Sequence, residues 1–399
     1  MWKRTLRDID LINKNVLVRV DFNVTLDKGN ITDDSRIRSV IPTIKYLQEQ
    51  NARIILCSHL GRPDGMVIDE MKLKPIAARL SEILEMPVIS TEDCIGTDTR
   101  AMVSALQPRG VALLENLRFH AEEEGNDPEF AKELASLADV FVNDGFAVAH
   151  RAHASTEGVT HHLPSVAGLL MEKELEILGT LLKSPQPPVA VILGGAKVSD
   201  KIAVIESFID KADTILIGGG MAATFIKANG YSVGNSSVEN ERLNFTMEIM
   251  ARAKDKGVSL LIPNDVIVGD TFSASAQPRT VRINNIPDGS LIMDIGHRTL
   301  DTYQASLAKT KTILWNGPMG VFEFPAFSRG TREIANTLAS LTGSTTVVGG
   351  GSTAEIVDSL GIAERITHVS TGGGASLEFL EGKNLPGVAA LLDEEDSKQ

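Results

Sequence analysis

The chain has 399 residues, of which 43% are hydrophobic and 23% are charged, and its formal net charge is −13 at pH 7. This length is enough for two domains with separate cores, and the acidic balance argues against bulk binding to nucleic acid or to an anionic membrane. The two cysteines, Cys57 and Cys94, form no Cys-x-x-Cys pair, which fits a reducing compartment and argues against a disulfide framework or a metal–thiolate site.

The N-terminal segment carries basic residues without the apolar stretch that follows them in a secretory signal. No run of the chain approaches the ~18 apolar residues that a membrane span requires. We therefore expect a cytoplasmic protein that binds neither nucleic acid nor membrane.

Short apolar runs bounded by glycine or polar residues recur along the chain and predict buried parallel strands. They lie at 15–20, 53–58, 111–116 and 140–144 in the first half, and at 189–193, 214–218, 260–263, 312–315, 345–349 and 367–370 in the second. Helical patterns separate most of them. The predicted fold is therefore α/β, with two Rossmann-like lobes that each hold a parallel sheet flanked by helices.

One amphipathic pattern separates the two sets of strands. Its apolar residues recur at i, i+4, i+7 and i+11, which predicts one buried helix face, and prolines follow. The apolar residues are Met171, Leu175, Leu178 and Leu182, and the prolines are Pro185, Pro187 and Pro188. We expect a first domain at 1–170, a connecting helix and hinge at 171–188, and a second domain at 189–384.

The strand ends of the first half carry charged and polar side chains. Ligands of open α/β sheets bind beyond the carboxyl ends of the strands, and arginine is suited to bidentate contact with carboxylate or phosphate. A pocket for a small, multiply charged anion is therefore predicted at Asp21, Asn23, Arg36, His59, Arg62, Arg118 and Arg151. The alternative is that the arginines are solvated and form surface salt bridges. His59 could also act as a general base, although the pattern does not require one.

Glycines follow the strands of the second half instead, at 194–195, 218–220, 349–351 and 372–374. Glycine lets backbone N–H groups approach an oxyanion, and a following helix N-terminus adds about half a positive charge. Lys197 and Lys201 are four residues apart, so we expect them to share a helix face and to neutralise a polyphosphate together. The alternative for any one of these turns is that its glycines only permit a tight turn.

A dinucleotide site is a second alternative for the same turns. Residues 218–223 and 349–354 both match G-x-G-x-x-A, a variant of the dinucleotide fingerprint. Glu239 follows the first match at roughly the ~20 residues expected of a ribose-binding acid. This alternative does not explain why Lys197 and Lys201 accompany a third glycine turn.

Four histidines of the first half raise the question of a metal. They are His150, His153, His161 and His162. Their spacing lacks His-Glu-x-x-His and no cysteine lies beside them, so zinc is not expected.

Eight motifs resemble those of the phosphoglycerate kinase family. In chain order they are RVDFNV (19–24), SHLGRP (58–63), LLENLRF (113–119), NDGFAVAHRAHAS (143–155), LGGAKVSDKI (193–202), LWNGPMGVFE (314–323), VVGGGSTA (347–354) and STGGGASLEFLEGK (370–383). The resemblance covers nearly the whole chain. It implies a two-lobed enzyme of glycolysis and gluconeogenesis that transfers a phosphoryl group reversibly from 1,3-bisphosphoglycerate to ADP, giving 3-phosphoglycerate and ATP. It further implies direct in-line transfer in a closed cleft.

The resemblance also implies which residues hold each substrate. The first domain, to which 385–399 would return, would hold the phosphoglycerate through Asp21, Asn23, Arg36, His59, Arg62, Arg118 and Arg151. The second would hold the nucleotide through Gly195, Lys201, Ile292, Asn316, Glu323, Gly349, Gly350, Gly351 and Ser352. Glu323 would bind the ribose hydroxyls and Ile292 would lie behind the adenine. Arg36, Lys197 and Gly373 would act on the phosphoryl group in transfer.

One position departs from the family pattern. Where the family usually has an Asp that meets the Mg²⁺ of the nucleotide, this chain has Ser352, and a neutral hydroxyl is a weaker Mg²⁺ ligand than a carboxylate. We expect Mg²⁺ to bind with ATP or ADP, held mainly by phosphate oxygens and water. The small-molecule substrates are the only partners expected, and the chain is expected to be a monomer.

Two other functions stay open at this point. The first is an NAD-binding oxidoreductase built on the G-x-G-x-x-A matches. The second is a phospho-ligand sensor that has lost turnover, with Ser352 as the residue responsible.

Overall fold

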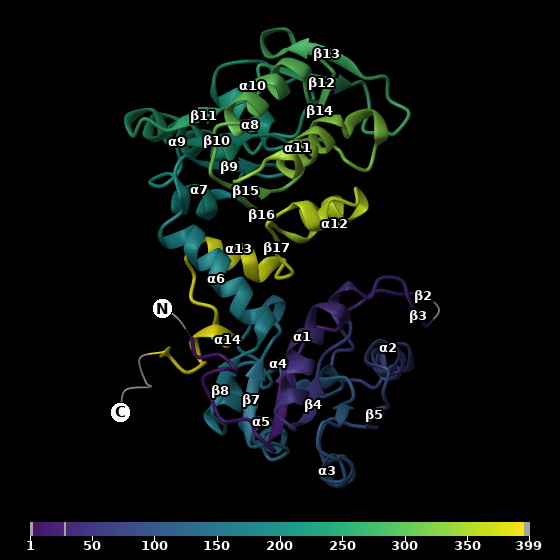
Figure 1. Cartoon of the computed structure of the whole chain (residues 1–399). Helices are drawn as coiled ribbons and strands as arrows, with labels where there is room; N and C mark the ends of the chain where they lie inside the picture. Colours follow the sequence, from purple (N-terminus) through teal and green to yellow (C-terminus); the bar gives the residue numbers. More distant parts are fainter. Residues whose placement is uncertain (1–2, 28, 395–399) are drawn as a thin grey trace. The chain divides into compact units, whose positions relative to one another are not determined.

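The structure is a computed structural model that describes residues 3–27 and 29–394. The chain forms two compact units (Figure 1). Unit 1 takes the chain as far as Ile177 together with the segment from Lys383 onward, and unit 2 comprises Leu178–Gly382. The division falls inside helix α6 (Leu169–Lys183), within the stretch 171–188 that was predicted to connect two domains.

Unit 1 contains a six-stranded parallel sheet in the order β5-β6-β4-β1-β7-β8. Its strands are β1 (Asn15–Arg19), β4 (Arg53–Cys57), β5 (Val88–Ser90), β6 (Val111–Leu113), β7 (Val140–Asn143) and β8 (Ser165–Ala167), and a separate hairpin joins β2 (Leu26–Asp27) to β3 (Asn30–Ile31). Its helices are α1 (Ser35–Glu49), α2 (Lys74–Leu84), α3 (Thr97–Ser104), α4 (Ala121–Glu124), α5 (Pro128–Ala135) and α14 (Pro386–Ala389). Val16 of β1 aligns with Ile54 of β4 and with Val140 of β7, which sets the register of the central strands.

The sheet of unit 1 is buried on both faces, as its continuous apolar strands predict. Successive residues of a strand point to opposite faces, and Val16, Leu17 and Val18 of β1 have no exposed surface. Val16 and Val18 join a core cluster with Ile37 and Ile44 of α1. Helix α1 therefore covers the face to which these two valines point.

Unit 2 contains a second six-stranded parallel sheet, in the order β11-β10-β9-β15-β16-β17 (Figure 1). Its strands are β9 (Val189–Leu193), β10 (Thr214–Ile217), β11 (Ser259–Leu261), β15 (Thr312–Asn316), β16 (Thr345–Gly349) and β17 (His368–Val369). Its helices are α7 (Ile202–Phe208), α8 (Ala222–Ala228), α9 (Leu243–Asp255), α10 (His297–Leu307), α11 (Arg329–Ser340), α12 (Gly351–Ser359) and α13 (Gly374–Leu380). Trp315 of β15 aligns with Ile192 of β9 and Val348 of β16, and all three are fully buried.

A small antiparallel sheet adds a second layer to unit 2. It consists of β12 (Asp265–Gly269), β13 (Arg279–Arg282) and β14 (Leu291–Ile295), in the order β13-β12-β14. Ile267, Met293 and Phe327 form a separate core cluster beside it. This sheet carries Ile292, which was predicted to lie behind the adenine.

Each predicted strand coincides with an observed one, so the predicted α/β fold with two helix-flanked parallel sheets is confirmed. The prediction missed β5 and β8, which have only three residues each, too few for a periodic pattern to stand out. It also missed β12, β13 and β14, which pair antiparallel and so lack the strand–helix alternation that marked the others.

The C-terminal segment packs in unit 1. Nδ2 of Asn143 donates to the carbonyl of Gly387 at 3.0 Å, and the N–H of Arg4 donates to the carbonyl of Leu392 at 2.8 Å. Of the segment 385–399 that was predicted to return to the first domain, residues 395–399 lie outside the described residues. None of the helices in the described chain is long and apolar enough to cross a membrane.

Candidate active site

Each parallel sheet has a point where the strand order reverses, and ligands of open α/β sheets bind at the carboxyl edge there. In unit 1 the reversal lies between β1 and β7, and in unit 2 it lies between β9 and β15. Asp21 and Asn23 follow β1, whereas Lys201 follows β9 and Asn316 ends β15. The predicted anion-binding residues of each unit therefore gather at the reversal of its own sheet.

Asp21 is the centre of the unit 1 cluster. Its Oδ2 forms an ion pair with Nη1 of Arg36, which stands in the first turn of α1. Its Oδ1 accepts the N–H of Asn23 at 3.2 Å and lies 3.9 Å from Nδ1 of His59. The Asp21 side chain is 11% exposed and that of Arg36 is 40% exposed. The arginine therefore keeps accessible surface with which to contact a ligand.

Arg19, which was not among the predicted residues, fixes His59 from the buried side. Nη2 of Arg19 lies 3.2 Å from Nδ1 of His59, and its Nε donates to Oγ of Ser155 at 2.8 Å. Because arginine only donates, Nδ1 of His59 is the acceptor and Nε2 carries the proton. Burial lowers the pKa of His59 well below its usual value, and the charges of Arg19, Arg118 and Arg151 lower it further. His59 is therefore a neutral donor, and its Nδ1 is not available to act as a base.

Asn23 and Arg118 meet at the backbone of Gly61. Oδ1 of Asn23 accepts the N–H of Gly61 at 2.9 Å, and Nη1 of Arg118 donates to the Gly61 carbonyl at 2.8 Å. Nε and Nη2 of Arg118 are buried without a hydrogen-bond partner in the described part of the chain, although Nη2 lies 3.1 Å from Oε1 of Glu124. Unsatisfied guanidinium donors of this kind favour an anionic ligand.

Arg62 and Arg151 are the remaining residues predicted for unit 1. Arg62 follows Gly61 directly and is exposed. Nε of Arg151 lies 3.3 Å from Nε2 of His150, and the charge of Arg151 contributes to the lowered pKa of His59. Arg62 therefore lies next to Gly61 in the chain, and Arg151 lies close enough to His59 for its charge to act on the imidazole.

Lys201 and Asn316 form the centre of the unit 2 site. Lys201 is only 9% exposed, and its Nζ donates to Oδ1 of Asn316. Nδ2 of Asn316 in turn donates to the carbonyl of Gly349 at 2.8 Å. Burial lowers the pKa of Lys201, and the charges of Asp200 and Glu381 oppose that shift. A phosphate oxygen at Nζ would favour the charged lysine more than the neutral Asn316 does.

Two glycines of unit 2 are required by the close approach of a neighbouring segment, and a third by its backbone conformation. Gly195, Gly219 and Gly350 have φ angles of +97°, +65° and +89°, but a Cβ on Gly195 would meet nothing within 4 Å. A Cβ on Gly219 would lie 2.5 Å from the backbone nitrogen of Gly195, and a Cβ on Gly350 would lie 2.8 Å from Nδ2 of Asn316. Gly219 therefore lets the turn after β10 approach the turn after β9, and Gly350 lets the turn after β16 approach Asn316 at the end of β15, which a tight turn alone would not need.

The prediction that Lys197 and Lys201 share a helix face is wrong. Helix α7 begins at Ile202, so Lys201 only precedes it and Lys197 lies in the loop, exposed to solvent. In this loop the N–H groups of Val198 and Ser199 donate to a carboxylate from elsewhere in unit 2. Lys201 is therefore buried and hydrogen-bonded to Asn316, whereas Lys197 is exposed.

Ile292 and Glu323 lie on neighbouring segments of unit 2. Ile292 is half-buried in β14, and the carbonyl of the next residue, Met293, accepts the N–H of Val321 at 2.8 Å. That bond joins β14 to the turn that carries the exposed Glu323. Within residues 3–27 and 29–394, no hydrogen bond or ion pair joins Ile292 or Glu323 directly to Lys201 or Asn316.

Ser352 and Gly373 occupy the starts of helices. Gly350 precedes α12, and Gly351 and Ser352 are exposed in its first turn. Gly373, with φ of +52°, precedes α13. At these two turns the chain offers backbone N–H groups and one neutral hydroxyl to a ligand.

Glu239 has a different role from the one that the dinucleotide alternative requires. Its Oε2 accepts the N–H groups of Val198 and Ser199 at 2.5 and 3.1 Å, and its Oε1 accepts the hydroxyl of Ser199 at 2.5 Å. Both carboxylate oxygens therefore hold the loop after β9, and neither is left for ribose hydroxyls. Sequence spacing missed this role because the contact joins segments that lie far apart in the chain.

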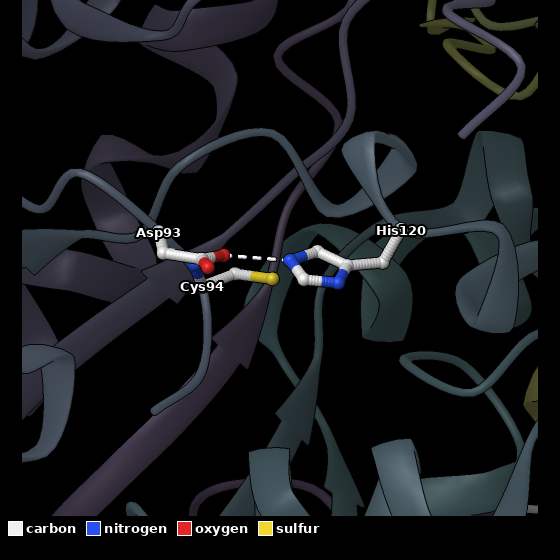
Figure 2. A group of neighbouring side chains, drawn as sticks. All are labelled: Asp93, Cys94 and His120. Atoms are coloured by element: carbon white, nitrogen blue, oxygen red, sulfur yellow. Dashed lines mark hydrogen bonds and ion pairs between the residues drawn. The ribbon is translucent and has the colours of Figure 1, made fainter. Parts of the chain in front are cut away.

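Three side chains of unit 1 that the sequence did not associate lie together: Asp93, Cys94 and His120 (Figure 2). Nε2 of His120 lies 2.7 Å from Oδ1 of Asp93, which also accepts the N–H of Cys94 at 2.6 Å. Burial raises the pKa of the Cys94 thiol well above its usual value, whereas the thiolate is the form that binds metal. Three candidate ligands are also fewer than the four of a structural zinc site. Protein hydrogen bonds thus account for this cluster, and we assign no metal to it.

Comparison with known proteins decides the family. The family model described as phosphoglycerate kinase matches residues 6–383. The chain belongs to the phosphoglycerate kinase family. The phosphoglycerate kinase of Acaryochloris marina is 56% identical over 398 residues, which cover 98% of this chain and 99% of that protein. That of Moorella thermoacetica is 53% identical over 393 residues, with 98% and 100% covered.

Solved structures of phosphoglycerate kinases share the fold. The structure from Coxiella burnetii has a TM-score of 0.88 and 42% sequence identity, and the match covers 97% of this chain and 98% of that one. The structure from Pyrococcus horikoshii OT3 has a TM-score of 0.81 and 35% identity, with 98% of each chain covered. The prediction of a phosphoglycerate kinase, a phosphotransferase, is confirmed, and neither the oxidoreductase nor the inactive sensor is favoured. The roles of individual residues stay predictions.

Proposed function

We propose that the two sheet edges divide the substrates of this phosphoglycerate kinase, with 3-phosphoglycerate on unit 1 and ATP or ADP on unit 2. The observation that carries the proposal is the contrast between the edges. Unit 1 offers guanidinium and imidazole donors around Asp21, which suit a small molecule with one carboxylate and one phosphate. Unit 2 offers Lys201 and the exposed glycine turn at the start of α12, which suit a polyphosphate.

On unit 1 the donors are proposed to hold the carboxylate and phosphate oxygens of 3-phosphoglycerate. Arg118 brings two guanidinium nitrogens without a hydrogen-bond partner among the described residues, and neutral His59 brings its Nε2–H. Asp21, paired with Arg36, can accept the hydroxyl of the substrate. Asn23, Arg62 and Arg151 complete the set as predicted.

On unit 2 Lys201 is proposed to exchange Asn316 for a phosphate of the nucleotide, supported by the N–H groups of the turn 349–351. Gly195 is proposed to lie against the nucleotide without donating its N–H, which the carbonyl of Pro318 accepts at 2.9 Å. Glu323 is proposed to bind the ribose hydroxyls and Ile292 to lie behind the adenine. The bond between Met293 and Val321 supports this, because it places β14 beside the turn that bears Glu323.

Arg36, Lys197 and Gly373 are proposed to act on the phosphoryl group itself. A carboxylate oxygen of 3-phosphoglycerate attacks the γ-phosphorus while the bond to the ADP oxygen breaks. The protein therefore has to align the groups and balance charge on the equatorial oxygens. The attacking carboxylate is already ionised, so no general base is required. This agrees with a neutral His59 whose Nδ1 is engaged by Arg19.

Mg²⁺ is proposed to bind with the nucleotide, held mainly by phosphate oxygens and water with Ser352 as a weak or water-mediated contact. When bound, the ion neutralises phosphate charge. The exposed Ser352 hydroxyl fits this arrangement, because Mg²⁺ usually keeps several waters and relies on substrate phosphates.

Magnesium titration of Ser352→Asp tests this proposal against Ser352→Asn, a variant of similar size without the charge. We expect the Asp variant to need roughly tenfold less Mg²⁺ for half-maximal rate and for tight ADP binding by calorimetry, since a carboxylate is a stronger ligand. The Asn variant should resemble the wild type. Equal magnesium requirements in all three proteins would count against the proposal.

The division of substrates is tested by calorimetry on two variants that control for each other. Arg118→Ala should weaken binding of 3-phosphoglycerate and leave ADP binding unchanged, whereas Lys201→Ala should do the reverse. A coupled assay with 3-phosphoglycerate, ATP and Mg²⁺ measures the activity in parallel. If either variant loses both substrates equally, the division is wrong. A cytoplasmic monomer stays a prediction, and sedimentation would test the monomer.

A further inference from the structure

The loop 194–201 of unit 2 is fastened at its two ends by the strand beside it. At its start, the N–H groups of Gly194 and Gly195 donate to the carbonyls of Asn316 and Pro318, both at 2.9 Å. At its end, Nζ of Lys201 donates to the side chain of Asn316. Between these points lies Lys197, exposed and proposed to act on the transferred phosphoryl group.

The middle of this loop is held by Glu239. Its carboxylate accepts three hydrogen bonds, from the N–H groups of Val198 and Ser199 and from the Ser199 hydroxyl. Burial of the carboxylate opposes ionisation, but these hydrogen bonds and the charge of Lys197 hold the pKa of Glu239 below its usual value. Glu239 is therefore ionised at neutral pH, and its three contacts are charge-assisted.

Glu239 is itself anchored to α8, the helix that follows the glycines at 218–220. The N–H of Glu239 donates to Oγ1 of the buried Thr224 at 3.2 Å. Nζ of Lys227 donates to Oδ1 of the next residue, Asn240, at 2.9 Å. The carboxylate thus links α8 to the residues directly after Lys197.

We propose that Glu239 is a positioning residue for phosphoryl transfer, whose carboxylate fixes residues 198 and 199 and so holds the adjacent Lys197 toward the nucleotide phosphates. The inference rests on the proposed function of unit 2. Glu239 does not bind the phosphates itself, because it is negatively charged and both its oxygens are engaged by the loop. Its effect is therefore expected on the phosphate-bearing part of the nucleotide and not on the nucleoside part.

The test compares Glu239→Ala and Glu239→Gln with Glu241→Gln, a control that removes an exposed carboxylate two residues away. Binding of ADP and of adenosine is measured by calorimetry, and kcat and KM for each substrate by the coupled assay. Glu239→Ala should weaken ADP binding about tenfold and lower kcat tenfold or more, since charge-assisted hydrogen bonds are lost. Adenosine binding and the KM for 3-phosphoglycerate should change less than about twofold. Glu239→Gln should recover part of the loss, because its amide oxygen can still accept one loop bond.

Several outcomes separate the possibilities. Equal loss of ADP and adenosine affinity in Glu239→Ala would mean general damage to unit 2 and would overturn the inference, as would wild-type behaviour. Should Glu239→Ala not fold, Ser199→Ala removes one of the three contacts, the bond from the Ser199 hydroxyl, and leaves the carboxylate in place. It should weaken ADP binding about threefold without changing adenosine binding. A wild-type chain that neither binds ADP nor makes ATP would instead refute the proposed function, which is a separate result.

Discussion

The sheet edge of unit 1 and that of unit 2 are built from different parts of the polypeptide. In unit 1 polar side chains follow the strands, and buried charged groups hold them. Arg19 contacts His59, and Ser155 links Arg19 to the fully buried Glu123. In unit 2 glycine turns follow the strands, and the glycines allow neighbouring backbone segments to approach each other. A side-chain site depends on each charge, whereas a backbone site depends on the absence of Cβ atoms.

The two sheets also differ in strand order. Unit 2 follows the order 3-2-1-4-5-6 of a dinucleotide-binding fold when its strands are numbered along the chain, whereas in unit 1 β6 stands between β4 and β5. Both nevertheless place predicted site residues, Asp21 in unit 1 and Lys201 in unit 2, after a strand at the point where the order reverses.

The largest effect is expected from removing one charge at the unit 1 edge. Arg36→Ala should lower kcat about 100-fold or more, as the loss of a donor to the transition state does, while Arg38→Ala should have little effect. Arg38 is a suitable control because it lies in the same helix and pairs with Asp34. Steady-state kinetics measure both. An unchanged kcat in Arg36→Ala would remove Arg36 from the catalytic residues.

A smaller effect is expected from adding one methyl group at the unit 2 edge. Gly219→Ala combines a positive φ with a Cβ only 2.5 Å from the nitrogen of Gly195, so we expect a loss of about 1–3 kcal/mol of stability and weaker ADP binding. Gly230→Ala is the matched control, because its φ is also positive, at +89°, but nothing lies within 4 Å of its Cβ. Calorimetric ADP binding should fall only in Gly219→Ala, and a loss in both variants would contradict a backbone site.

The smallest effect concerns a buried acid behind the unit 2 edge. Burial raises the pKa of Asp294 to about 7, although hydrogen bonds from the N–H groups of Gly330 and Ile295 oppose the shift. The folded state therefore binds this proton more tightly than the unfolded state, and the contribution to stability is lost as pH rises from about 4 through about 7. Asp294→Asn should remove this dependence, even though exchanging an acceptor for an amide group lowers stability overall.

Urea unfolding at several pH values measures that effect. In a Trp2→Phe background Trp315 is the remaining tryptophan, and it is buried in unit 2. Asp301→Asn, at an exposed position of α10, serves as the control. If Asp294→Asn keeps the same slope of unfolding free energy against pH as the control, the carboxyl of Asp294 does not titrate as described.

Local sequence patterns were sufficient for most strands of the two parallel sheets and for the polar residues that follow them. Apolar strands followed by Asp21, His59 or Lys201 carry their own signal, because the strand end and the polar residue are adjacent in the chain. The prediction of a helix across Lys197 and Lys201 was wrong because the contact that matters there joins residues far apart in the chain. The loop that stands there instead is held by Glu239, about 40 residues away, and single-sequence periodicity contains no information about such a contact.

Arg19 illustrates a signal that was present and not used. It is a charged residue at the end of an otherwise apolar strand, NVLVR, and a buried charge requires partners. Its partners, His59 and Ser155, come from two other segments. The sequence could therefore mark Arg19 as unusual, but only the fold shows that it orients His59.

The two cysteines of the chain both lie in unit 1, so unit 2 contains no thiol. Cys57 and Cys94 are fully buried, and burial raises the pKa of Cys57 to about 12. Alkylating reagents attack the thiolate, so the folded chain should be labelled slowly. The labelling rate then reports how often unit 1 opens, independently of unit 2. Its dependence on 3-phosphoglycerate and on ADP would show which ligand slows that opening.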